Sequence, residues 1–157
     1  MNDEKFLQAY DKYKNTVYSV IYNYLRNAED AFEISQDTFI NFYTYGGVFN
    51  SNEHIKAWLI RVAINNCKNH LRSKKHISAL PIPVDMPSDD KYETDEIITE
   101  VMKLPEKYRV PIHLFYYEEY NVCEIAAILG LPEATVKTRL KRGREKLGKN
   151  LRKEDWL

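Results

Sequence analysis

The sequence predicts an all-α protein made of two small helical domains joined by a flexible linker. Apolar residues recur at helical spacing along most of the chain, and no segment shows the sustained period-two alternation of a half-buried strand. Near the middle, a stretch with three prolines and much of the acidic charge interrupts the helical patterns. At 157 residues the chain has room for one ordinary domain or two small ones. We therefore expect domains at residues 1–75 and 94–157, with the linker at 76–93.

Three helices are expected in the N-terminal domain. Apolar residues at alternating steps of four and three between Phe6 and Tyr24 predict one helix, or two helices end to end. A second helical pattern spans about 28–43 and stops before the adjacent glycines at 46 and 47. A third spans about 52–72 and includes Trp58 on its apolar stripe, so we expect Trp58 in the core. The alternative for Trp58 is an exposed ring on which a base stacks.

The C-terminal domain begins with two further helical patterns. The first starts near Thr94 and stops at Leu104. The second follows directly, because the proline at the next position is suited to the first turn of a new helix. Pro111 follows about a turn and a half later. Because proline has no backbone N–H to donate, it predicts a kink or a delayed start of that helix.

The last two predicted helices have the plan of a helix-turn-helix. Asn121 is a good N-cap for a short helix at 122–129, and Glu124 completes a capping-box pair with it. Gly130 suits the left-handed end of that helix, and Pro132 opens a basic helix that runs to about residue 151. The inward positions of the two helices are Ile125, Ala126, Leu129, Val136, Leu140 and Leu147. A solvated amphipathic helix within a bundle is the alternative interpretation.

The outward face of this basic helix carries side chains that bond base edges and phosphates in a DNA groove. They are Glu133, Thr135, Lys137, Thr138, Lys141 and Arg142. From Lys137 to Lys153 there are nine basic residues against one acid, whereas residues 77–95 hold five acids against one lysine. The overall net charge of zero therefore hides a segregation that favours a nucleic-acid partner at the C-terminal end.

No catalytic residue, metal site or other cofactor site is predicted. The four histidines and two cysteines lack metal-ligand spacing, and there is no glycine-rich phosphate loop or nucleophile motif. Cys67 and Cys123 fall in apolar stripes, where a free cysteine acts as a small hydrophobe. The N-terminus lacks the apolar core of a secretion signal, and no apolar run is long enough to span a bilayer. We expect a cytoplasmic protein without direct membrane insertion.

Several motifs together resemble the bacterial ECF (extracytoplasmic-function) sigma factors of RNA polymerase. In the C-terminal half these are Leu104-Pro105-Glu106, Glu124-Ile125-Ala126, Thr135-Val136-Lys137-Thr138-Arg139-Leu140 and Arg142-Gly143-Arg144. In the N-terminal half they are Asp30-Ala31, Gln36-Asp37-Thr38-Phe39, Phe49, Ala57-Trp58-Leu59, Arg61-Val62-Ala63, Asn65 and His70-Leu71-Arg72. The resemblance covers nearly the whole chain except the linker. Asn69 departs from it, since the family often has aspartate there.

The resemblance implies an alternative sigma factor that binds core RNA polymerase and directs initiation at promoter DNA, with no catalysis of its own. It also implies an N-terminal bundle of the sigma region-two type, a minus-35-binding C-terminal domain and an anti-sigma factor as a further partner. The expected polymerase-binding residues are Asp30, Glu33, Gln36, Asp37 and Asn41. The expected minus-10 residues are Asn52, His54, Lys56, Arg61, Asn65, Asn69 and Arg72.

For the minus-35 element, the first turns of the basic helix are expected to meet base edges. The base-reading candidates are Glu133, Thr135, Lys137 and Thr138, and the phosphate candidates are Arg139, Lys141, Arg142 and Arg144. Glu133 has two interpretations, as an acceptor for a cytosine amino group or as an acid placed to suit the helix macrodipole. Two other functions stay open from the residues alone. One is a stand-alone helix-turn-helix regulator, and the other is a small nuclease using the N-terminal acids.

Overall fold

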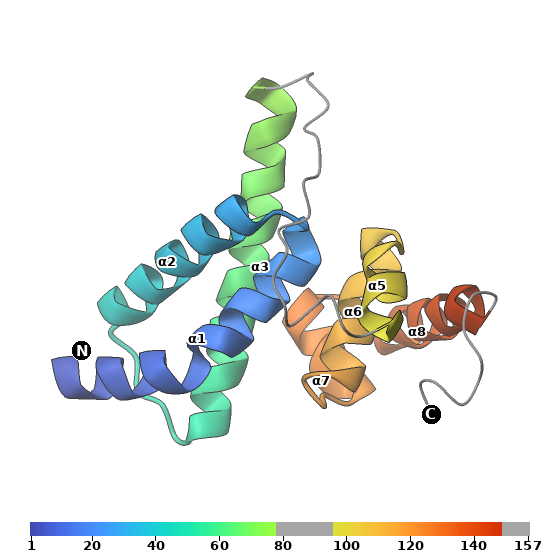
Figure 1. Ribbon diagram of the computed structural model, residues 1–157. Helices are drawn as coiled ribbons and strands as arrows, with labels where there is room; N and C mark the ends of the chain where they lie inside the picture. The colour runs from blue at the N-terminus through green and yellow to red at the C-terminus, as the bar shows by residue number, and fades with distance from the viewer. Residues whose placement is uncertain (78–95, 149–157) are drawn as a thin grey trace. The chain divides into compact units, whose positions relative to one another are not determined.

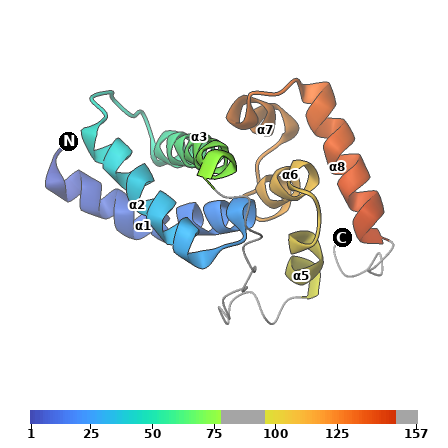
Figure 2. The same ribbon diagram turned by 90° about the horizontal axis from the view of Figure 1, so that it is seen from above.

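The computed structural model describes residues 1–77 and 96–148, and the chain divides into two compact units, Met1–Asp85 and Met86–Leu157. Within those described ranges all regular structure is α-helical, which confirms the predicted fold class (Figures 1 and 2). The predicted linker lies almost wholly at 78–95, outside the described residues, and so does the predicted end of the last helix at residue 151.

The N-terminal unit consists of α1 (Asp3–Leu25), α2 (Ala28–Thr44) and α3 (Asn52–Ile77). Asn2 caps α1 by accepting a hydrogen bond from the Glu4 amide, and Asn27 caps α2 through the Asp30 amide. Only two residues connect α1 to α2. The first of them, Arg26, turns the chain in the left-handed conformation, with φ 55°. This tight turn lays α1 and α2 antiparallel and side by side (Figure 2).

The core of the N-terminal unit lies where all three helices meet. Its largest fully buried side chains are Val17, Ile21, Tyr22, Phe42, Leu59, Ile60 and Ile64. Each such side chain contributes roughly 1.5–3 kcal/mol by leaving water. The third helix continues five residues beyond the predicted Arg72, to Ile77, so residues 76 and 77 of the predicted linker are helical.

The C-terminal unit consists of α5 (Glu96–Met102), α6 (Glu106–Tyr116), α7 (Val122–Leu129) and α8 (Glu133–Gly148). Helix α6 is central and packs against the other three (Figure 2). Two of its polar residues are buried. Arg109, 2% exposed, donates a hydrogen bond of 2.7 Å to the Leu104 carbonyl at the α5–α6 turn. His113 is 8% exposed.

Helix α6 corrects one expectation. Of the two alternatives expected from Pro111, a kink or a delayed start, the delayed start is wrong, because the helix begins at Glu106 and Pro111 lies inside it. The fixed φ of proline fits a helix, and the missing N–H removes one intrahelical bond to the Lys107 carbonyl. Because Pro111, Val110 and Ile112 are all buried, packing offsets the loss of that bond.

Candidate promoter and polymerase interfaces

The helix-turn-helix forms as predicted. Asn121 and Glu124 make a complete capping box at the start of α7, and Gly130 ends the helix with φ 67°. All six predicted inward positions are buried, so α8 is fixed against α7 and α6. Pro132 precedes α8, and its carbonyl accepts the first helical bond, from Val136.

This packing exposes most of the predicted minus-35 residues. The exposed ones are Glu133, Lys137, Thr138, Lys141 and Arg142, whereas Thr135, Arg139 and Arg144 are half-buried. The Thr138 hydroxyl donates 3.0 Å to the Ala134 carbonyl. Its proton is therefore used inside the helix, and its oxygen is left to accept from a partner.

Arg144 is held inside the C-terminal unit. Its Nε donates to the Tyr116 hydroxyl at 2.5 Å, and its guanidinium lies 5.3 Å from the centre of the Phe115 ring. These contacts tie α8 to the end of α6. The sequence did not reveal this structural task, because the partners lie 28 residues away.

Cys123 does not lie in an apolar stripe, contrary to prediction. It is exposed, and it hydrogen-bonds to the side chain of Glu133 at the start of α8. That bond, together with the nearby negative charge, raises the pKa of the Cys123 thiol. A position on the first turn of α7 faces the start of α8 instead of the core, and the apolar pattern alone did not distinguish these two environments. Glu133 thus has an intramolecular partner besides its two predicted roles.

The predicted minus-10 residues fall into two groups on α3. Arg61, Asn65, Asn69 and Arg72 are exposed, and their spacing places them on one face of the helix. Asn52, His54 and Lys56 lie at its beginning instead. The Asn52 carbonyl accepts a 2.9 Å bond from the Tyr13 hydroxyl, whose pKa is raised by burial and by the charge of Glu53. The start of α3 is therefore anchored to α1.

His54 shapes the loop that precedes α3. Ser51 caps the helix by accepting from the His54 amide, and Nδ1 of His54 accepts from the Asn50 amide, both at 3.1 Å. The imidazole also packs edge-on against Phe49, with the ring centres 5.1 Å apart. Because Nδ1 is occupied as an acceptor, the Nε2 atom of a neutral ring carries the proton.

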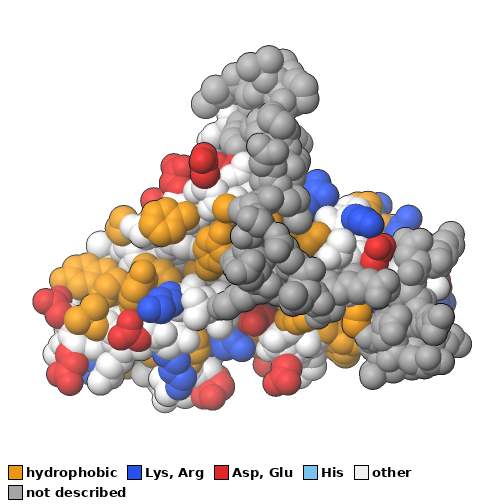
Figure 3. All heavy atoms as spheres, viewed as in Figure 1, with side chains coloured by type: hydrophobic (Ala, Val, Ile, Leu, Met, Phe, Trp, Pro, Cys, Tyr) orange, Lys and Arg blue, Asp and Glu red, His pale blue; other side chains and the backbone are white. Residues whose placement is uncertain are grey.

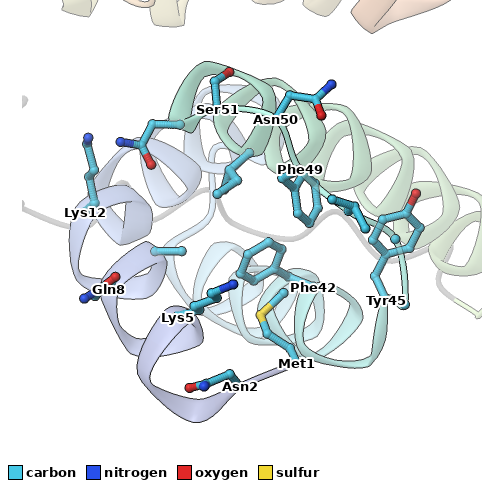
Figure 4. Close-up of a pocket in the computed structure, with 16 residues that line it drawn as sticks. Met1, Asn2, Lys5, Gln8, Lys12, Phe42, Tyr45, Phe49, Asn50 and Ser51 are labelled. Atoms are coloured by element: carbon cyan, nitrogen blue, oxygen red, sulfur yellow. The ribbon is translucent and has the colours of Figure 1, made fainter.

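A hollow of about 760 Å³ lies beside this loop, between the start of α1 and the end of α2. Its lining combines aromatic, amide and lysine side chains, and Figure 4 shows Lys5 extending toward Phe42, with Phe49 and Tyr45 on the loop side. Trp58 is half-buried and packs against Phe42, Tyr45 and Phe49, at 4.9–5.8 Å between ring centres. It belongs to an aromatic cluster that supports the loop.

Helix α2 presents four of the five predicted polymerase-binding residues to solvent: Glu33, Gln36, Asp37 and Asn41. Asp30 is different, because its carboxylate lies 3.3 Å from Nε2 of His70 and the two side chains are only 18% and 16% exposed. The contact between Asp30 and His70 links α2 to α3 at the distance of an ion pair, but the two groups are not aligned for a hydrogen bond. The Asn41 side-chain oxygen accepts from Asn66 at 3.0 Å, so it also has an internal partner.

Two apolar residues on the same helix were missed by the sequence analysis. Phe32 is 62% exposed and Ile40 is 59% exposed, and hydrophobic side chains gather over α1 and α2 on the face seen in Figure 3. Phe32 and Ile40 each lie four residues from Gln36, so the three side chains form one row along α2 that is separate from its buried residues. An exposed apolar row beside acidic residues is typical of a protein-docking surface.

Within the described ranges, no group of three or more His, Cys, Asp or Glu side chains is placed to hold a metal ion. A search of those same residues finds no helix with the length and apolar character needed to cross a bilayer.

Comparison with known proteins defines the class. The sigma-70 region 2 family model matches residues 9–77, and the sigma-70 region 4 model matches residues 94–147. The chain is 33% identical over 170 residues to the ECF RNA polymerase sigma factor SigW of Bacillus subtilis (strain 168), covering 96% of this chain and 91% of that protein. It is 27% identical over 147 residues to the RNA polymerase sigma factor SigV of the same organism, covering 91% of this chain and 89% of the relative.

The fold comparison agrees. The sigma factor RpoE from Bartonella quintana, solved in complex with the anti-sigma factor NepR, superposes with a TM-score of 0.70 at 19% identity, over 93% of this chain and 96% of that one. A helical unit of the region 2 type followed by a helix-turn-helix unit of the region 4 type defines a sigma-70-class transcription factor. Within that class the chain belongs to the ECF family, as an alternative sigma factor that directs transcription initiation.

Proposed function

We propose that the two units read two separate promoter elements while the N-terminal unit holds core RNA polymerase. The observation that carries this proposal is that each unit exposes its own DNA-type surface. On α3 the surface is the face of Arg61, Asn65, Asn69 and Arg72, and on α8 it is the exposed basic face of the helix-turn-helix. A stand-alone helix-turn-helix regulator needs only the second surface.

The α3 face and the neighbouring hollow suit the minus-10 element during opening. Amide side chains bond base edges, and the arginines neutralise phosphates. Unpaired bases seek stacking partners, and the aromatic and amide lining of the hollow offers a place for a base that has left the duplex. Asn69→Ala is expected to alter base preference within the minus-10 element more than overall affinity. A uniform loss across all minus-10 variants would make Asn69 a positioning contact.

Helix α2 is the proposed polymerase-docking surface. Phe32 and Ile40 supply apolar area, and Glu33, Gln36 and Asp37 supply polar contacts around it. Asp30 acts internally through its contact with His70. Replacing Glu33 and Asp37 by lysine should abolish co-purification with core polymerase without loss of helicity.

The control for that experiment is Asp11→Lys, an exposed acid on α1 whose only ion-pair contact in the described chain is with Lys14. It should leave co-purification intact. If the α2 double variant binds polymerase as the parent does, this surface is removed from the proposal.

Transcription by added core polymerase tests the function as a whole. The purified chain should make core polymerase initiate at specific sites in a library of genomic fragments, with start sites read by sequencing. A stand-alone regulator would bind DNA and produce no polymerase-dependent start sites. We further propose that the chain has no catalytic activity of its own, acts in the cytoplasm and is held by an anti-sigma factor, as its family membership suggests.

A further inference from the structure

A second basic feature of the C-terminal unit lies away from the first turns of α8. Lys107 on α6 and Lys146 on α8 place their ammonium groups 5.1 and 5.6 Å from the centre of the Tyr108 ring. Arg142, one turn before Lys146, adds a third positive charge close enough to act on the same phenol. We call Lys107, Tyr108, Arg142 and Lys146 the Tyr108 cluster.

The pKa of the Tyr108 phenol reflects the positive charge of the Tyr108 cluster. Tyr108 is 7% exposed, and burial by itself acts to raise its pKa. The hydrogen bond with Lys107 and the charges of Lys107, Arg142 and Lys146 outweigh burial and leave the Tyr108 pKa below its ordinary value. The ring body is packed inside while its hydroxyl end lies among cations.

These cations have no acidic partner in the part of the chain that the structure describes. The contrast is Lys103 of the same unit, which pairs with Glu100 at 3.0 Å. Lys107 also stands in the first turn of α6, where the helix macrodipole disfavours a positive charge. Helix stability therefore does not account for Lys107, and converging cations without a counter-charge indicate an anionic partner from outside.

The cluster is continuous with the face of α8 assigned to DNA. Thr135, Arg139, Arg142 and Lys146 follow steps of four, three and four, which places them along one side of the helix. This row runs from the base-reading turns to the Tyr108 cluster. A phosphodiester, whose two free oxygens accept several donors at once, matches three cations around one hydroxyl.

We propose that the Tyr108 cluster binds a backbone phosphate of the promoter duplex beside the minus-35 element. Lys107 and Lys146 supply the charge, Arg142 joins them from the DNA-facing row, and the Tyr108 ring holds the lysines in place. The proposal rests on the proposed function and extends it, because it brings α6 into contact with DNA. The contact adds affinity and carries no sequence information.

The test compares holoenzymes made with the parent chain and with the Lys107→Ala/Lys146→Ala variant. Binding to labelled promoter duplexes that differ only in the minus-35 element is measured between 50 and 200 mM KCl, an ionic range of the order over which phosphate contacts are lost. The double variant should bind every duplex more weakly. The slope of log affinity against log salt concentration should become less steep by about one. Lys103→Ala is the matched control and should leave the slope unchanged. Circular dichroism confirms that all variants remain helical.

The other outcomes would overturn the proposal in distinct ways. An unchanged slope would mean that the cluster touches no phosphate, and a loss limited to certain minus-35 sequences would mean that it reads bases. Weaker binding to core polymerase with an unchanged DNA slope would assign the cluster to an acidic protein surface. A parent holoenzyme that ignores the minus-35 sequence would overturn the proposed function instead. The slope difference between parent and variant would still decide the cluster on any duplex.

Discussion

His113 makes the C-terminal unit sensitive to acid. Its imidazole is buried in α6, its Nε2 has no hydrogen-bond partner among the described residues, and its ring stacks on Tyr117 with the ring centres 5.3 Å apart. Burial lowers the pKa of His113 from 6.5 to about 4. Between these values the unfolded chain binds a proton that the folded chain does not. Stability is therefore full above pH 6.5 and falls as the pH drops toward 4.

The expected loss from this one group is about 3 kcal/mol over that interval. Urea unfolding followed by circular dichroism at pH 7, 5.5 and 4.5 measures it. His113→Phe keeps a ring without a titrating group, and it should reduce the stability difference between pH 7 and 4.5 by about 2.5 kcal/mol. If parent and variant lose stability in parallel, other groups account for the acid sensitivity.

Gly143 allows α6 and α8 to approach closely. A Cβ there would overlap the Cδ1 atom of buried Ile112 and lie 3.3 Å from the Tyr108 Cβ. Alanine would gain roughly 1 kcal/mol in helix propensity, but overpacking costs about 1–3 kcal/mol. We expect Gly143→Ala to lower the free energy of unfolding by about 1 kcal/mol.

Two matched variants sharpen this prediction. Gly148→Ala, on the same helix with open space around it, should be neutral or slightly stabilising. Ile112→Val removes the Cδ1 atom that an alanine at 143 would meet, so Gly143→Ala should cost less in that background. Equal costs of Gly143→Ala in both backgrounds would mean that Ile112 is not the constraint.

At the scale of the single helix, we expect α8 to separate residues that read bases from residues that support the fold. The Thr138 hydroxyl is free only to accept, because it already donates its proton in a hydrogen bond to the Ala134 carbonyl. We therefore expect it to favour a base that presents an amino group. Thr138→Val keeps the shape and removes the acceptor. It should change minus-35 preference at one base pair by about 1–3 kcal/mol, measured with a minus-35 library.

Arg142→Ala is the comparison and should weaken all minus-35 sequences alike. A uniform effect of Thr138→Val with a sequence-specific effect of Arg142→Ala would mean that α8 is docked in another rotation. Arg144→Ala should behave differently from both, because it breaks the tie to Tyr116 and lowers the stability of the C-terminal unit.

Local signals explain why most elements were predictable from sequence. The first helix of the helix-turn-helix carries its own start and stop, Asn121 and Gly130, and these need no tertiary information. The α1–α2 boundary was equally local, since Asn27 is a side-chain cap. The restart at Pro105 was equally local, whereas a delayed start caused by Pro111 was wrong, because the burial around Pro111 depends on helices elsewhere in the chain.

The residue types of the candidate site were predictable from the sequence, whereas the internal contacts of those residues were less so. Exposure of Lys137 and Lys141 followed from helical periodicity. The internal partners of Asp30 and Arg144 did not, because His70 and Tyr116 are distant in sequence and neither pair has a characteristic spacing. The exposure of Phe32 was not predicted either, because apolar residues in a helical pattern are ordinarily assigned to the core.

At the scale of the whole molecule, the two units have separate cores, and their described helices pack within each unit. We expect calorimetry of the full chain to resolve two transitions. Gly143→Ala should shift the transition of the C-terminal unit by several degrees, since about 1 kcal/mol moves a domain of 60–100 residues by roughly 4–8 °C. The N-terminal transition should stay in place. A joint shift of both transitions would show that the units unfold as one.

The aromatic cluster around Trp58 gives the loop before α3 an optical signal of its own. The chain has only two tryptophans, and the other is Trp156 near the C-terminus. With Trp156→Phe, all indole emission of the chain comes from the Trp58 ring, which packs against Phe42, Tyr45 and Phe49. These three residues line the proposed base-accepting hollow. A single-stranded minus-10 oligonucleotide should change that emission, and the change would report binding of an unpaired base beside Trp58 without an added dye.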